Sequence, residues 1–111
     1  MDIDKTVSAI ENLLNSIQKA SDIEKFQTYV AIKVISNELL EYVQNRRDAG
    51  DNIDHDSARG YLVELFYHLK TMVGLEDNGH SFEQNLLWVT GIIDKLRSCH
   101  CFDLQAPKEP R

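Results

Sequence analysis

Proline is missing from most of this 111-residue chain, and the two that occur, Pro107 and Pro110, both lie within the last five residues. Because proline breaks helix interiors, its absence favours long helices. Cysteine is equally scarce. The two cysteines, Cys99 and Cys101, are only two positions apart and cannot join distant segments. This cysteine usage predicts a reducing, cytoplasmic location.

The chain also lacks long apolar runs and an excess of basic residues. No run of about 18 apolar residues occurs, so we expect no membrane-spanning helix. Lys and Arg number 12 against 18 Asp and Glu, which gives a net charge of −6 and predicts no nucleic-acid partner. The acids around residues 48–56 instead predict attraction of a basic protein partner.

What the chain does contain is helical periodicity. In the first segment, apolar residues recur at alternating intervals of four and three positions, which are Ile3, Val7, Ile10, Leu14 and Ile17. Similar patterns, separated by short polar segments, predict four helices over about residues 2–20, 22–49, 56–73 and 81–99. The sequence therefore predicts an all-α, single-domain antiparallel four-helix bundle over residues 1–101, followed by a loose tail at 102–111.

Residues that begin and end helices support these boundaries. Ser21 and Glu24 form a capping box, which places the start of the second helix near residue 22. Gly50 and Gly74 are predicted to end the second and third helices in a left-handed conformation. Asp54 or Asp56 is positioned to cap the third helix.

The helix over 22–49 carries two apolar stripes on nearly opposite sides. The first stripe consists of Ile23, Phe26, Val30 and Val34, and the second of Ile32, Ile35, Leu39, Tyr42 and Val43. One groove cannot bury both stripes. The helix could kink near Ser36–Asn37, it could be central with different neighbours at its two ends, or the second stripe could bury against another chain.

The last predicted helix also has apolar residues outside its core seam, including Trp88 and Ile92. Aromatic residues are enriched where protein chains meet. We therefore expect these two helices to contact a second copy of the chain, and we predict a homodimer. The predicted partner-binding residues are Ile32, Ile35, Leu39, Tyr42, Trp88 and Ile92.

One alternative function rests on His68 in the stretch FYHLKTMVG. This stretch resembles histidine phosphotransfer domains, which are also acidic helical bundles of this length. The resemblance implies that His68 accepts a phosphoryl group. The family places a lysine three residues after the histidine, whereas Lys70 follows after two, and Glu64 one turn earlier would repel a phosphoryl group.

A second alternative is a magnesium-dependent nucleotide hydrolase. Glu38 and Glu41 form an E-x-x-E pair that resembles the first acidic pair of the all-α nucleotide pyrophosphohydrolases. That family needs a second acidic pair on the next helix, where this chain has Glu64 followed by Tyr67. In this reading, acids near Asp51 would complete the magnesium site.

Other polar clusters do not provide a complete site. The acidic segment 51–56 departs from a calcium-binding loop, and Cys99, His100 and Cys101 need a further ligand from elsewhere to hold zinc. We therefore expect no catalytic residue, no metal and no cofactor. The sequence predicts a non-enzymatic, acidic protein-binding module of the regulator, immunity-protein or chaperone type.

Overall fold

The structure is a computed structural model that describes residues 1–51 and 53–98. It contains four α-helices, which are α1 (Ile3–Ser16), α2 (Asp22–Asp48), α3 (His55–Met72) and α4 (Phe82–Ser98). A short 3-10 helix, η1 (Ile17–Lys19), extends α1. The predicted all-α, single-domain four-helix bundle is confirmed. The expected tail at 102–111 and the triplet Cys99–His100–Cys101 lie outside the described residues.

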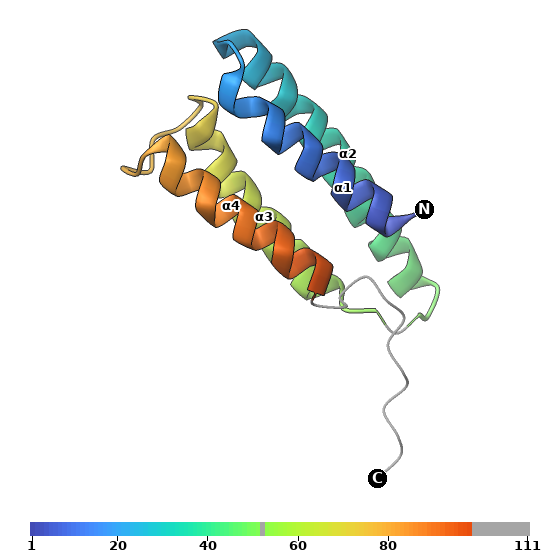
Figure 1. The fold of residues 1–111 in the computed structure, drawn as a ribbon. Coiled ribbons are helices and arrows are strands. Elements are labelled where there is room, and N and C mark those ends of the chain that lie inside the picture. The colour runs from blue at the N-terminus through green and yellow to red at the C-terminus, as the bar shows by residue number, and fades with distance from the viewer. Residues whose placement is uncertain (52, 99–111) are drawn as a thin grey trace.

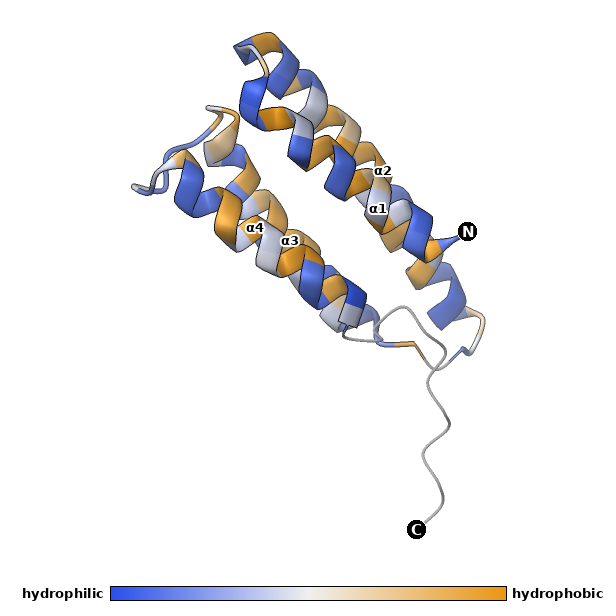
Figure 2. Cartoon of the chain, viewed as in Figure 1, coloured by the Kyte–Doolittle hydropathy of each residue, from blue (hydrophilic) through white to orange (hydrophobic). Residues whose placement is uncertain are grey.

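The helices form two antiparallel hairpins that lie side by side (Figure 1). Helices α1 and α2 make the first hairpin, and α3 and α4 make the second. Across the hairpins, α2 contacts α3 and α1 contacts α4. Hydrophobic and hydrophilic bands alternate along each helix, which is typical of amphipathic helices (Figure 2). Among the helices of the described ranges, none has both the length and the apolar composition that crossing a bilayer requires.

Side chains cap the helix starts as the sequence indicates. The two halves of the predicted capping box are both present, because the Glu24 N–H donates to Ser21 Oγ at 3.3 Å and the Ser21 N–H donates to Glu24 Oε1 at 3.2 Å. Hydrogen bonds from the Ser21 hydroxyl and backbone N–H lower the pKa of Glu24. Asp54 caps α3 by accepting from the Ser57 N–H at 3.1 Å.

Two predicted glycines follow helix ends. Gly50 has φ 95° and Gly74 has φ 82°, a left-handed conformation that side chains with a Cβ rarely adopt. Chain reversal after α2 and α3 therefore depends on glycine at these positions.

The core runs the length of the bundle and takes one row of side chains from each helix. Helix α1 contributes the predicted 4-3 seam, and α3 contributes a row from Ala58 to Met72. The fully buried large residues are Val7, Ile10, Ile17, Ile32, Leu39, Val43, Leu62, Leu65, Leu69, Val89, Ile93 and Asn85. Two polar residues, Asn85 and the smaller Ser36, are also fully buried in this interior.

A polar contact also joins the first helix to the last. Arg97 of α4 donates to Glu11 Oε2 at 2.7 Å and to Ser8 Oγ at 3.1 Å, both on α1. The hydrogen bond from Arg97 lowers the pKa of Glu11 and raises that of Arg97. The pair is partly exposed to solvent. It therefore contributes little to stability.

Candidate binding surface

Helix α2 exposes a line of large apolar side chains over its N-terminal half. Ile23 is 68% exposed, Phe26 47%, Val30 43% and Val34 52%. Their spacing of three, four and four residues aligns them along one side of the helix. We call these four residues the α2 stripe. Helix α2 is continuous from residue 22 to 48, so no break at Ser36–Asn37 turns the stripe toward the core.

In the second stripe, the prediction of Ile32 and Leu39 as contact residues is wrong, whereas that of Ile35 and Tyr42 stays a prediction. Ile32 and Leu39 are fully buried in the core of the single chain, and Ile35 and Tyr42 are half-buried against it. Buried side chains of the protomer cannot also contact a second molecule. Of the two stripes, the first is the one left exposed to solvent.

The length of each stripe explains which of them is buried. The second stripe, which faces the core, continues to Val43 near the end of α2. It therefore supplies apolar side chains along the full length of the neighbouring helices. The α2 stripe stops at Val34, and polar residues, Asn37 and Glu41, occupy the next positions on its line. The bundle buries the row that supplies apolar area along its whole length.

On α4, the two predicted contact residues have different surroundings. Ile92 is buried in the core, so its prediction as a contact residue is also wrong. Helix α4 buries two adjacent positions, Ile92 and Ile93, which makes its inward face wider than a narrow seam. Trp88 is 36% exposed, and its ring lies 4.8 Å from the rings of both His68 and His80.

A groove between α2 and α3 lies next to the α2 stripe, because the ring of Phe26 stacks on that of Tyr29, which lines the groove. The groove has a volume of about 290 Å³, and Tyr29 and Phe66 meet edge to face in it with ring centroids 5.8 Å apart. Val63 is 60% exposed on the α3 wall and continues the apolar surface. Lys33 lines the α2 wall and Lys70 the α3 wall. The apolar surface therefore spans two helices and has positive charge inside it.

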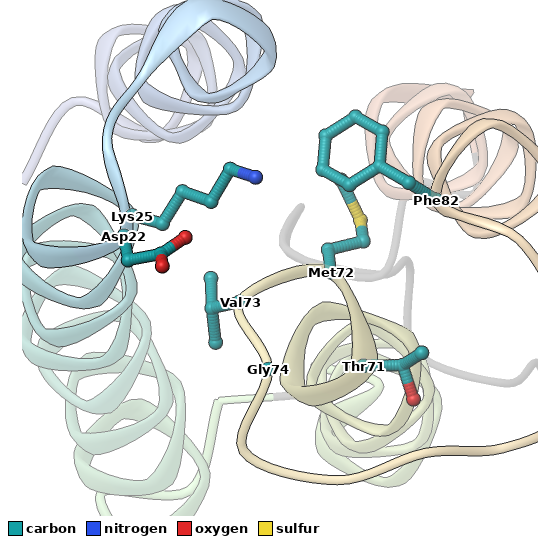
Figure 3. A pocket seen from close by; sticks show the side chains of 7 residues that line it. All are labelled: Asp22, Lys25, Thr71, Met72, Val73, Gly74 and Phe82. Carbon is teal, nitrogen blue, oxygen red and sulfur yellow. The ribbon is translucent and has the colours of Figure 1, made fainter.

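A second groove lies at the end of the bundle (Figure 3). Asp22 and Lys25 at the start of α2 face Met72 and Val73 at the end of α3, and Phe82 of α4 closes the far side (Figure 3). Lys25 Nζ lies 5.1 Å from the centroid of the Phe82 ring. Asp22 is thereby located on the side of α2 that faces α3.

The acidic segment at 48–56 has partners within the chain. Asp51 forms a salt bridge with Arg46, which also donates to Tyr42 Oη at 2.6 Å. These contacts, led by the one to Asp51, raise the pKa of Arg46. Asp54 caps α3, and Asp56 lies 3.9 Å from Arg47. Much of the negative charge expected to attract a basic partner is therefore balanced locally.

His68 belongs to a partly buried polar network, centred on the buried Asn85, that the sequence did not reveal. Asn85 Nδ2 donates to the Ser81 carbonyl at 2.9 Å, which orients the amide. Asn85 Oδ1 then accepts from Asn78 Nδ2 at 2.7 Å and lies 3.0 Å from His68 Nδ1. The only sequence signal was a polar residue, Asn85, on the same helical face as Val89.

The carboxylates of the proposed magnesium site do not converge. Glu38 and Glu41 are exposed on the outer side of α2, and Asp51 is engaged by Arg46. Within the described ranges, no group of three or more His, Cys, Asp or Glu side chains is placed to hold a metal ion.

Comparison of the chain with protein-family models, with curated proteins and with solved structures found no match.

Proposed function

We propose that this protein is a non-enzymatic protein-binding module whose contact surface is the α2 stripe. One observation carries the proposal. Four large apolar side chains are exposed in a line on one helix, although the bundle closes its core without them. Single exposed apolar residues are ordinary, whereas a contiguous row marks a surface that another molecule covers.

The size of the exposed surface supports a protein partner. The four side chains expose on the order of 400 Å², within the about 300–600 Å² of the largest patch on a typical monomer, which is often functional. Covering this area releases roughly 10 kcal/mol at about 25 cal/mol per Å², before the costs of association are subtracted. The helical shape of the surface suits an apolar helix of the partner.

A cytoplasmic location and a regulator, immunity-protein or chaperone role remain part of this proposal. The location rests on cysteine usage. The role rests on the general occurrence of small acidic bundles among such proteins, which is an analogy of fold.

Site-specific photo-cross-linking tests the proposal. A benzoyl-phenylalanine in place of Val34 should cross-link the chain to another polypeptide in cells that express it naturally. The same group in place of Thr90, which is exposed on α4, is the matched control. We expect adducts from position 34 at several times the yield from position 90. Equal yields at the two positions would show that the α2 stripe is ordinary surface.

A further inference from the structure

We infer that the molecule covering the α2 stripe is a second copy of this chain, with the two α2 helices packed antiparallel around a two-fold axis near residue 28. This inference rests on the proposed function and names the partner of the same surface.

The order of apolar residues in the stripe fits antiparallel pairing. With the axis near residue 28, Ile23 lies opposite Val34 of the second copy, and Phe26 lies opposite Val30. All four residues then face an apolar residue, and the contact is isologous. A shift of the axis by one turn, to residue 32, would place Ile23 opposite Glu41 and Phe26 opposite Glu38. The apolar pattern therefore selects one register.

The charges beside the stripe match the same register. Lys33 and Asp22 both lie on the flank of α2 that faces α3, because each lines a groove shared with that helix. A two-fold axis perpendicular to the helices brings this flank against the same flank of the second copy. Lys33 then lies within about one residue of Asp22 of the second copy along the helix axis, and symmetry repeats the pair.

Both charged groups are available for this contact. Within residues 1–51 and 53–98, neither Lys33 nor Asp22 has an ion-pair partner inside the chain. Lys33 Nζ instead lies 5.9 Å from the centroid of the Tyr29 ring, at the groove wall. An intermolecular salt bridge therefore breaks no internal one.

Helix α3 widens the contact at the same level of the bundle. Because α2 and α3 are antiparallel and Tyr29 meets Phe66, the α2 stripe lies level with the exposed residues Val63 and Tyr67. With these two residues the apolar area approaches about 600 Å² per copy, against about 800 Å² per partner in a standard interface. The area fits a reversible dimer.

The balance of charge on this surface favours a second copy over a strongly charged partner. Lys33 and Asp22 of α2 carry opposite signs, and Lys70 on the α3 side lies 3.6 Å from Glu76 of its own chain, so both signs are present. A strongly basic partner would be repelled by the lysines and a strongly acidic one by the carboxylates. A copy turned through 180° places its Asp22 beside Lys33 and its Lys33 beside Asp22.

Charge exchange tests the register directly. Sedimentation equilibrium at low ionic strength should show a wild-type dimer. Lys33→Glu and Asp22→Lys should each raise the dissociation constant of the dimer about 5–10-fold. Each substitution places like charges side by side at both symmetry-related contacts. The double variant should return to within about 2-fold of wild type. Lys95→Glu and Glu83→Lys, equivalent reversals on exposed positions of α4, are the controls and should have little effect.

The possible failures separate this inference from the proposed function. A dimer that Val34→Glu dissociates, but that the Lys33 and Asp22 exchange leaves unchanged, overturns the register. A wild-type chain that stays monomeric at about 1 mM overturns the second copy as partner. In that case, cross-linking of a different polypeptide from position 34 would still support the proposed function, whereas loss of both results would overturn it as well.

Discussion

Which side of α2 faces the core decides where any partner binds, and two alanine substitutions on this helix test it. Leu39 is fully buried and Val34 is 52% exposed, although the two residues are little more than one turn apart. Leu39→Ala removes a fully buried side chain from the core cluster, to which all four helices contribute. Such changes cost about 2–5 kcal/mol.

The cost at Leu39 is large compared with the total stability of the domain. Domains of this size have unfolding free energies of about 5–15 kcal/mol. A loss of about 3 kcal/mol should lower the melting temperature by roughly 15 °C. Val34→Ala should change the unfolding free energy by less than about 0.5 kcal/mol, because the residue is half in solvent and alanine is the better helix former.

Urea unfolding followed by circular dichroism at 222 nm measures both effects. The protein concentration must be a few-fold below the dimer dissociation constant, so that association does not contribute to stability. The reasoning is refuted if Val34→Ala destabilises the chain as much as Leu39→Ala does. That result would mean that α2 is rotated about its axis relative to the structure.

Three further outcomes follow from the structure. Asn85→Ala should lower the unfolding free energy by about 1–3 kcal/mol in urea titrations, because partly buried Asn78 and His68 lose their hydrogen-bond partner, whereas exposed Asn12→Ala should change it little. Because the hydrogen bond from Arg97 lowers the pKa of Glu11 from its usual 4.5, the pair stabilises the fold above that pH, and this contribution disappears as the pH falls through the lowered pKa. Arg97→Ala should therefore reduce the loss of unfolding free energy between neutral and acidic pH. The reduction should be under about 1 kcal/mol, because the pair is exposed. Spin labels at exposed position Asn45 should lie about 50 Å apart in the antiparallel dimer, and a separation near 10–20 Å would instead show parallel packing.

The helices and their ends could be predicted because the signals are local. The capping box of Ser21 and Glu24, the cap at Asp54 and the terminal Gly50 and Gly74 each depend on residues a few positions apart. Hydrogen bonding and backbone conformation at these sites are largely independent of the rest of the fold.

The orientation of α2 could not be predicted by periodicity, because both of its stripes repeat correctly. The choice between them depends on how much apolar area each presents to neighbouring helices over their whole length. Asn37 and Glu41, which interrupt the line of the α2 stripe, were the available signal. The contact of His68 with Asn85 joins positions 17 residues apart, and helical periodicity carries no information about such pairs.

The short length of the α2 stripe has a consequence for how many copies can associate. Antiparallel pairing over residues 22–34 uses the whole stripe of each chain, so a pair leaves no equivalent apolar row for a third chain. The C-terminal halves of the two α2 helices then extend past the contact in opposite directions, with Glu38 and Glu41 exposed on the line that the stripe would otherwise follow. These carboxylates disfavour sliding by one turn, because sliding would set them against apolar side chains. A contact that is isologous and limited to one register closes at two chains and does not propagate into a filament.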